Sequence, residues 1–320
     1  MNVWGFSIVG LLVIAVGCVA RVPDPTATPR PVPTATPLTA VGPGSADRDL
    51  RWAGVDSWVY QLTGYKDDRL DQLIASGYDL VVIDLTRDGA DGYFTREEVQ
   101  ALQAKGKIVL AYFEIGAIET YRPEWSAVPD ELRLGEVSGW PDEHYVAYWD
   151  ERWWSVVRGR LDQALRSGFD GVYLDLVNAY EEIPARAAGT DRDDLAQRMV
   201  HLLVRIAAYA KAQDTGFRIV PQNAPELYLY PGYLEAVDGL GMEELTVLAT
   251  DRPCDADWCE ENRTAAAAVR AAGKLVLAVD YADEPTLIDL AYRNAREMGF
   301  VPYVTVVELD RVRPNAGWEP

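Results

Sequence analysis

The chain has 320 residues, of which 25% are charged, and its formal net charge is −20 at pH 7. This acidic excess excludes a nucleic-acid partner, because nucleic-acid binding depends on a basic surface. A cationic partner is compatible with the charge, and so is a well-solvated acidic surface without a partner.

The first 18 residues have the pattern of an export signal. An apolar run over residues 8–16 is too short to span a bilayer and is typical of a signal-peptide core. Gly17 precedes Cys18, so we expect a lipoprotein signal in which Cys18 becomes the lipidated first residue of the mature chain. No Lys or Arg precedes the apolar run, and Ala15 stands where such signals usually carry Leu. An ordinary secretory signal or an uncleaved anchor therefore stays open.

Residues 19–48 are rich in Pro, Thr and Ala and have no apolar period. Such a segment cannot bury a core and favours an extended spacer. We expect a disordered stalk that holds the following domain away from a membrane surface. Residues 49–320 have the length of one α/β barrel domain, which we expect to be a monomer.

Short apolar runs alternate with helical patterns from residue 51 onward. Eight runs are rich in Val, Ile and Leu, as in parallel strands covered on both faces. They lie at residues 57–62, 80–84, 108–113, 171–175, 217–220, 239–243, 275–279 and 303–307. Helical patterns lie near residues 69–73, 95–104, 151–166, 193–211, 225–235, 260–272 and 285–298. Thr95 and Glu98 have the spacing of a capping box.

This alternation predicts a (β/α)8 TIM barrel with a short or missing last helix, because few residues follow the last strand. An open doubly wound sheet is the alternative. It is disfavoured because no glycine-rich phosphate loop follows the first strand.

The predicted strand ends are unusually acidic. Asp84, Asp175, Glu243 and Asp280 each end a strand, and Glu119 follows another. Burying several carboxylates together is costly, and a fold does not need them, whereas acid–base chemistry does. A single strand-end Asp that caps a helix would be unremarkable. Because barrel enzymes place catalytic groups at the carboxyl ends of strands, we expect the active site here.

Strand parity selects Glu243 over Glu244. Side chains alternate along a strand, so Glu244 shares a face with Met242, which suits the side covered by helices. Glu243 then points to the barrel axis. By the same rule Tyr173 and Asp175 share a face.

The sequence contains few of the residues and motifs that other hydrolytic mechanisms need. The two histidines are His144, in a predicted loop, and His201, in a predicted helix. The sequence has no Gly-x-Ser-x-Gly or His-Glu-x-x-His, which disfavours an esterase or a zinc hydrolase, and we expect no metal or other cofactor. Carboxylates with nearby aromatic rings favour glycoside hydrolysis. The rings that could stack on sugars, or else pack in the core, are Trp58, Tyr60, Tyr112, Trp149, Tyr173 and Tyr281.

Cys254 and Cys259 are the cysteines outside the predicted signal. A close pair in an exported chain predicts a small loop disulfide. A metal site is the alternative, but no His or further Cys lies nearby to complete four ligands. Two free thiols also stay open.

Longer strings of residues carry a family resemblance. They include Phe-Asp-Gly-Val-Tyr-Leu-Asp at residues 169–175 and the spacing from Tyr112 through Gly116 and Glu119 to Tyr121-Arg122-Pro123. From about Trp58 to Leu309 the chain resembles glycoside hydrolase family 114, the endo-α-1,4-polygalactosaminidase-like barrels. Part of that group has been labelled cysteinyl-tRNA-synthetase-related. The label has no support here, because the His-Ile-Gly-His and Lys-Met-Ser-Lys-Ser signatures are absent.

The resemblance implies that Asp175 is the nucleophile or charge stabiliser and that Glu243 is the general acid/base. It also implies a substrate-binding site lined by Asp84, Glu119, Tyr112, Asn223 and Asp280. Asn178 and Ala117 depart from the family pattern, where many relatives carry Asp and Glu, so we expect altered contacts there. The family's better-studied substrates are partly deacetylated, cationic galactosaminogalactans, which would suit a net charge of −20.

The sequence therefore predicts an exported glycoside hydrolase, anchored through Cys18 or secreted, that cleaves a hexosamine-containing polysaccharide. Two alternatives stay open, since a fold does not imply a function. One is a carbohydrate-binding lipoprotein without turnover. The other is a structural envelope protein that presents the barrel to a protein partner.

Overall fold

The computed structural model describes residues 45–320, apart from 88, 90–91, 185–188 and 249–250. The predicted signal peptide, Cys18 and the linker up to residue 44 lie outside the described residues. Helix α1 (Ser45–Ala53) begins before residue 49, inside the segment for which we expected a linker. In the described part of the chain, no helix is both long and apolar enough to cross a membrane.

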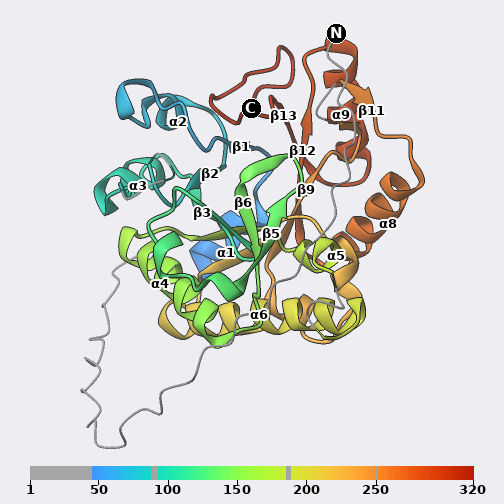
Figure 1. Ribbon diagram of the computed structural model, residues 1–320. Helices are drawn as coiled ribbons and strands as arrows, with labels where there is room; N and C mark the ends of the chain where they lie inside the picture. Colours follow the sequence, from blue (N-terminus) through green and yellow to red (C-terminus); the bar gives the residue numbers. More distant parts are fainter. Residues whose placement is uncertain (1–44, 88, 90–91, 185–188, 249–250) are drawn as a thin grey trace, which may run out of the picture. The chain divides into compact units, whose positions relative to one another are not determined.

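Eight strands of the described chain form two parallel sheets (Figure 1). The first sheet has the order β1-β2-β3-β7-β8 and the second the order β13-β12-β9. These strands are β1 (Trp58–Tyr60), β2 (Leu80–Asp84), β3 (Ile108–Glu114), β7 (Gly171–Asp175), β8 (Arg218–Pro221), β9 (Gly239–Glu243), β12 (Leu275–Tyr281) and β13 (Val301–Thr305). Each corresponds to one predicted apolar run.

The last strand begins earlier than predicted, at Val301, and includes Pro302. Proline has no N–H to donate, so it is uncommon inside a strand. Among the described strands β13 pairs with β12, and Pro302 stands opposite Ala278 in that ladder. An edge strand tolerates proline, because the missing N–H can face the unpaired side.

The strands follow the order of the chain, without the reversal that defines a doubly wound sheet. An isolated bridge between Gln222 and Gly241 connects the two sheets, and Asn223 N donates to Gly241 O at 2.8 Å. The structure therefore shows an α/β fold with parallel strands.

Helices cover the strands from outside. Helix α3 packs against β3, α4 against β7, α8 against β9 and β12, and α9 against β13. The helices after α1 are α2 (Asp71–Ala75), α3 (Arg96–Gln103), α4 (Glu151–Ser167), α5 (Ala179–Glu182), α6 (Arg192–Gln213), α7 (Tyr233–Ala236), α8 (Asp257–Ala271) and α9 (Pro285–Glu297), with 3-10 turns η1 (Lys66–Asp68), η2 (Trp125–Ala127), η3 (Asp130–Leu132) and η4 (Pro225–Leu229). The predicted capping box begins α3, where the Thr95 side chain accepts from Glu98 N. Residues 306–320, which follow β13, contain no helix.

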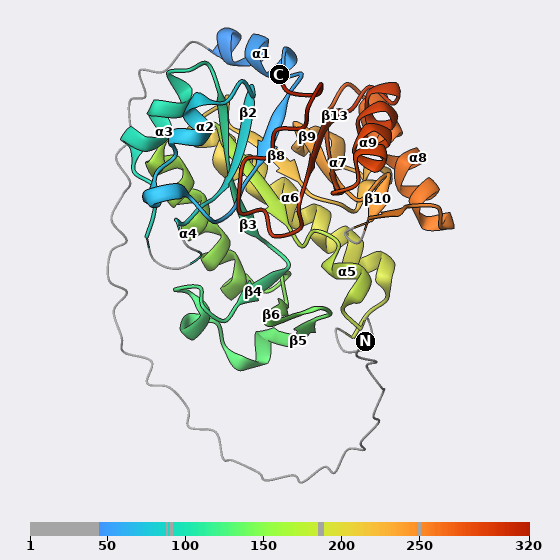
Figure 2. The same cartoon turned by 90° about the horizontal axis from the view of Figure 1, so that it is seen from above.

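The long segment between β3 and α4 contains a sheet that the sequence analysis did not predict. It is antiparallel, with the order β4-β6-β5, and lies beside the parallel strands (Figure 2). Its strands are β4 (Ala117–Glu119), β5 (Arg133–Val137) and β6 (Trp140–Val146). Gly135, Pro141 and Asp142 are poor strand formers, so local pattern did not reveal it. A second small pair joins β10 (Val247–Leu248) to β11 (Arg252–Pro253).

Aromatic rings fill the space between the parallel strands. The ring centroids of Trp58 and Tyr60 are 5.9 Å apart, and those of Tyr60 and Tyr173 are 5.2 Å apart. Gly241 makes room for this cluster, because a Cβ at that position would lie 1.9 Å from Tyr173 Oη. Trp58 and Tyr173 are completely buried. Both rings therefore pack in the core in this structure, which is the alternative to sugar stacking that the sequence left open, and sugar contact by Tyr173 stays a prediction.

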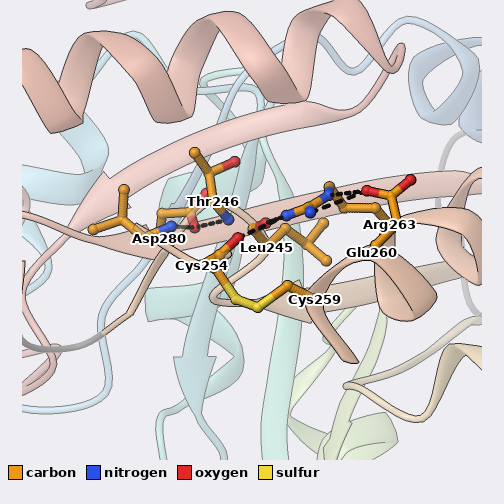
Figure 3. Close-up of a disulfide and its surroundings, with 8 residues drawn as sticks. Leu245, Thr246, Cys254, Cys259, Glu260, Arg263 and Asp280 are labelled. Carbon is orange, nitrogen blue, oxygen red and sulfur yellow. Dashed lines mark hydrogen bonds and ion pairs between the residues drawn. A yellow bond between two sulfur atoms is a disulfide. The ribbon is translucent and has the colours of Figure 1, made fainter. Parts of the chain in front are cut away.

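Cys254 and Cys259 form a disulfide that ties the segment after β11 to the first turn of α8 (Figure 3). Arg263 of α8 donates from Nη1 to Leu245 O at 2.7 Å and to Cys254 O at 3.1 Å. The disulfide and this arginine together fasten the chain that follows β9 onto α8.

Replacing both cysteines by Ala is expected to lower the free energy of unfolding by about 2 kcal/mol, because the crosslink closes a short loop. Urea unfolding of the double variant and the wild type measures this difference. Dithiothreitol should shift the wild-type midpoint and leave that of the variant unchanged. An equal shift in both proteins would contradict a stabilising disulfide.

Candidate active site

Asp175 and Glu243 share one hydrogen-bond donor. Asp175 ends β7 and Glu243 ends β9, and β8 lies between these strands. Just after β8, Gln222 donates from Nε2 to Asp175 Oδ1 at 3.1 Å and to Glu243 Oε2 at 2.6 Å. Because Gln222 Nε2 donates both bonds, the distance between Asp175 Oδ1 and Glu243 Oε2 cannot exceed the sum of the two bond lengths.

The Asp175 carboxylate is fixed from both sides. Tyr112 Oη donates to Oδ2 at 2.6 Å, and the backbone N–H of Leu176 donates to Oδ1 at 2.6 Å. Charge-assisted bonds of this kind favour the ionised form of an acid. They also hold the side chain in one orientation.

The Glu243 carboxylate has its own set of donors. Asn223 Nδ2 donates to Oε2 at 2.9 Å, and Tyr281 Oη donates to Oε1. The Asn223 side chain also accepts from Glu243 N at 3.1 Å. Glu243, which strand parity selected over Glu244, is thus the acid whose carboxylate meets Gln222.

Tyr60 acts on the pair through Gln222. Its hydroxyl donates to Gln222 Oε1 at 3.1 Å, while the ring is almost fully buried. This bond orients the amide so that its nitrogen faces the two acids. Tyr60 is therefore a positioning residue in this structure, and its predicted contact with substrate stays a prediction.

The backbone turns sharply where these strands end. Leu176, Asn223 and Glu244 follow β7, β8 and β9 with φ angles of 54°, 62° and 57°. Such left-handed conformations cost energy in residues other than glycine, and they cluster at functional sites. At Leu176 the turn aims the N–H back at Asp175, so the conformation serves the site directly.

Burial controls protonation of the pair. Burial and the nearby charge of Glu243 raise the pKa of Asp175 to about 7. Burial also raises the pKa of Glu243. Two close carboxylates that resist ionising together share a proton readily, as general acid–base chemistry requires. Burial raises the pKa of Tyr112 and Tyr281 well above 10, which keeps both hydroxyls as donors.

Tyr112→Phe is expected to move the acidic limb of the kcat/KM profile to higher pH. The Tyr112 hydrogen bond lowers the pKa of Asp175, so its loss raises that pKa further and delays ionisation. The pH dependence of kcat/KM measures the shift. Tyr78→Phe is the matched control, because the Tyr78 hydroxyl contacts only the backbone of Arg313. An unchanged acidic limb in Tyr112→Phe would contradict this role.

Three further acids, Asp84, Glu114 and Glu119, lie together around two arginines. We name these five residues, Asp84, Glu114, Glu119, Arg122 and Arg160, the Arg122 cluster. Arg122 Nη1 and Nη2 bond both oxygens of Asp84 at 2.9 Å, and Nε bonds Glu114 at 3.2 Å and also Glu119. Arg160 Nη1 contacts Glu114 Oε2 at 3.3 Å. Asp84 and Glu119 were predicted to bind substrate. Here their carboxylates hold the fold through Arg122, and the substrate contacts stay predictions.

Protons are divided unevenly within the Arg122 cluster. Burial alone would raise the pKa of Glu114, but the charges of Arg122 and Arg160 outweigh it and bring the pKa to about 2. Burial and the negative charge of Glu114 raise the pKa of Glu119 to about 10. Arg122 and Arg160 therefore favour the ionised form of Glu114, and the charge of Glu114 favours the protonated form of Glu119.

In the part of the chain that the structure describes, neither Asp280 nor Trp149 forms a hydrogen bond with Asp175 or Glu243. Asp280 is buried, and its Oδ1 accepts from Thr246 N and Val247 N at 2.8 Å each (Figure 3 draws the first). It fastens the segment after β9 to β12. The half-buried ring of Trp149 packs edge-on against Tyr148, with centroids 4.9 Å apart. For both, contact with substrate stays a prediction.

The sequence analysis missed Gln222 and Arg122 as site residues, although Arg122 stands in a string that carries the resemblance. A signal for Gln222 was present. The fifth predicted strand runs between those that carry Asp175 and Glu243, so a polar residue at its end must lie between the two acids. No comparable signal marked Arg122, because it reaches the strands from the irregular chain after β4.

Cavities and metal-binding groups do not point to another catalytic centre in the described residues. A cavity of about 670 Å³ lies at the amino ends of β12 and β13, opposite the carboxylate pair, and its lining includes Trp52, Arg296 and Trp318. In the same described ranges, no cluster of three or more His, Cys, Asp or Glu side chains could hold a metal ion.

Paired, hydrogen-bonded acids at the carboxyl ends of parallel strands are an arrangement that glycoside hydrolases use. The chain belongs to glycoside-hydrolase family GH114, whose model matches residues 43–317. It is an enzyme that hydrolyses O-glycosyl bonds.

Relatives by sequence cover most of the chain. An uncharacterized protein of Deinococcus radiodurans is 38% identical over 296 residues, which cover 91% of each chain. An uncharacterized protein of Methanocaldococcus jannaschii is 30% identical over 277 residues, covering 82% of this chain and 78% of that one.

Solved structures share the fold at low sequence identity. Aspergillus fumigatus Ega3, solved in complex with galactosamine, superposes with a TM-score of 0.63 at 18% identity, covering 81% of this chain and 93% of that one. The glycoside hydrolase domain of PelA from Pseudomonas aeruginosa gives a TM-score of 0.64 at 17% identity, covering 82% and 99%.

Proposed function

We propose that the protein is an exported glycoside hydrolase that cleaves a hexosamine-containing polysaccharide with retention of configuration, using Asp175 and Glu243. The observation that carries the proposal is the shared donor Gln222, because it limits the distance between the two acids. Its bonds of 3.1 and 2.6 Å fit the roughly 5–5.5 Å separation typical of retaining enzymes. Inverting enzymes need roughly 6.5 Å or more, to admit a water molecule.

In this mechanism Asp175 attacks the anomeric carbon while Glu243 gives its proton to the leaving glycosidic oxygen. The bond from carbon to that oxygen breaks, and a glycosyl ester forms on Asp175. Glu243, now ionised, takes a proton from water, whose oxygen attacks the same carbon and frees Asp175. Tyr112 and Leu176 stabilise the Asp175 anion, and the burial of Glu243 favours its protonated form.

We infer that the eight parallel strands close into a (β/α)8 barrel. Trp58 Nε1 donates to Val301 O at 2.9 Å, and Leu62 N donates to Leu309 O at 2.7 Å, which holds β1 beside β13 and the chain after it. Closure would bring the carboxyl ends of all eight strands around one mouth, with Asp175 and Glu243 inside it.

The proposed substrate is a polymer that contains galactosamine. The net charge of −20 favours a cationic chain over a neutral one, and Ega3, whose fold is similar, was solved with galactosamine. Polygalactosamine with partial N-acetylation is therefore the substrate to test first.

The stereochemistry of the first product tests the proposed mechanism. Proton NMR of a fresh reaction with α-1,4-linked polygalactosamine should show the α anomer first, before mutarotation forms the β anomer. Initial appearance of the β anomer would contradict retention while leaving hydrolysis intact.

We propose that Cys18 carries a lipid anchor and that the protein lies outside the cytoplasm, with secretion as the alternative. Metabolic labelling with palmitate should mark the wild type and leave Cys18→Ala unlabelled. Equal labelling of the two proteins would contradict lipidation at this residue.

A further inference from the structure

Glu143 is a buried acid on the antiparallel sheet that follows β3. It lies on β6 opposite Glu119 of β4, and only 9% of its surface is exposed. Within the residues that the structure describes, its carboxylate takes part in no hydrogen bond or ion pair. The acids of the Arg122 cluster differ in this respect, because each of them bonds Arg122.

The sheet that carries Glu143 lies against the end of the strand that carries Asp175. Val146 N of β6 donates to Gly116 O at 3.0 Å, and Ile115 N donates to Asp175 O at 2.9 Å. Gly116 packs so closely here that a Cβ would lie 2.1 Å from Leu176 O. Burial, and then the charges of Glu114 and Asp175, raise the pKa of Glu143 to about 9. Glu143 is therefore close enough to Glu114 and Asp175 for their charges to act on it.

The nearby cations do not neutralise Glu143. Arg122 and Arg160 are close enough to lower its pKa, but their guanidinium groups bond the acids of the Arg122 cluster and Glu124. A buried carboxylate without a partner costs stability, and Gln would fill the same volume without that cost. A positive group on a bound ligand therefore explains why an acid stands at residue 143.

We propose that Glu143 selects an amino sugar, because its carboxylate accepts hydrogen bonds from the ammonium group of a hexosamine unit bound beside Asp175. This inference rests on the proposed function, since it places a sugar at the carboxylate pair. It adds a specificity-determining residue from a sheet that lies outside the parallel strands. Because burial raises the pKa of Glu143 to about 9, the acid carries a proton at neutral pH in the free protein. A bound ammonium group favours the ionised form, whereas an N-acetyl group has no positive charge and gains no charge-assisted contact.

The test compares polygalactosamine with the same polymer after complete chemical N-acetylation. Glu143→Gln is expected to lower kcat/KM on the amino polymer by about 10- to 100-fold, mainly through KM, because a charge-assisted contact is lost. Its kcat/KM on the acetylated polymer should not fall. Glu136→Gln is the matched control, since Glu136 is an exposed acid on the neighbouring strand β5.

An equal fall on both polymers, or no fall on either, would overturn the role of Glu143. A wild-type protein that cleaves neither polymer would instead contradict the proposed function. We expect Glu143→Gln to unfold close to the wild-type temperature at neutral pH, because the raised pKa of Glu143 leaves the acid neutral and Gln has the same volume. A second test uses free monosaccharides as inhibitors of the wild-type enzyme, so its result does not depend on whether the variant folds. Galactosamine should inhibit at least about tenfold more strongly than galactose, and equal inhibition would overturn the proposal.

Discussion

Asp175→Asn and Glu243→Gln are each expected to lower kcat on polysaccharide by about 10³-fold or more, while the affinity for the polymer stays close to that of the wild type. Both substitutions keep the size of the side chain and most of its hydrogen bonds, so the fold should persist. Each substitution removes one of the two proposed catalytic groups. Asn at 175 cannot attack the anomeric carbon, and Gln at 243 cannot supply a proton.

An aryl galactosaminide with a very acidic leaving group separates the two roles. Such a leaving group departs without a proton, so Glu243→Gln should recover its first chemical step and release a burst of phenol. Asp175→Asn should show no burst. Glu244→Gln, the neighbour with opposite parity, is the control and should keep most of its activity. A burst from Asp175→Asn with none from Glu243→Gln would reverse the assigned roles.

Arg122→Met is expected to lower the free energy of unfolding by about 3–5 kcal/mol at neutral pH, because the acids of the Arg122 cluster lose their common cation. Arg122 and Asp84 are both almost fully buried, so water cannot take the place of the lost bonds. Urea unfolding measures the difference. Arg152→Met is the matched control, since Arg152 pairs with Asp150 and Glu131 while half exposed, and it should leave the free energy of unfolding nearly unchanged.

The effect of Arg122→Met should depend on pH in a definite direction. In the folded wild type the pKa of Glu114 is about 2, below the ordinary value of 4.5. A lowered pKa stabilises the fold above pH 4.5, and this contribution is lost as the pH falls toward 2. The gap between wild type and variant should therefore narrow across that window. A gap that stays constant from pH 7 to pH 3 would contradict the ion-pair account.

Local patterns in the sequence were sufficient for the parallel strands and for the two acids. Each strand is a continuous apolar run, and parity along β9 distinguished Glu243 from Glu244 without any knowledge of neighbours. These features depend on the period of the backbone, which the sequence carries directly. Asp175 followed in the same way, as the acid that ends such a run.

Partners that approach from distant segments could not be predicted in this way. Arg122 comes from the irregular chain after β4, and nothing in its spacing indicates that it meets Asp84 and Glu114. The same limit applies to Glu143, whose strand contains residues that disfavour strands. Tyr173 was named as a ring that could stack on sugar, but it lies two residues before the end of β7 and is completely buried. How far a residue lies from the end of its strand decides whether its side chain is buried, and the alternation of side chains does not give this distance.

The release of reducing ends from partly N-acetylated polygalactosamine by the purified protein tests the central claim most directly. We expect oligosaccharides to accumulate with the wild type and to be absent with Asp175→Asn. If the wild type binds the polymer and releases no oligosaccharide from it or from any other hexosamine polymer, the account of Asp175 and Glu243 as a hydrolytic pair is contradicted.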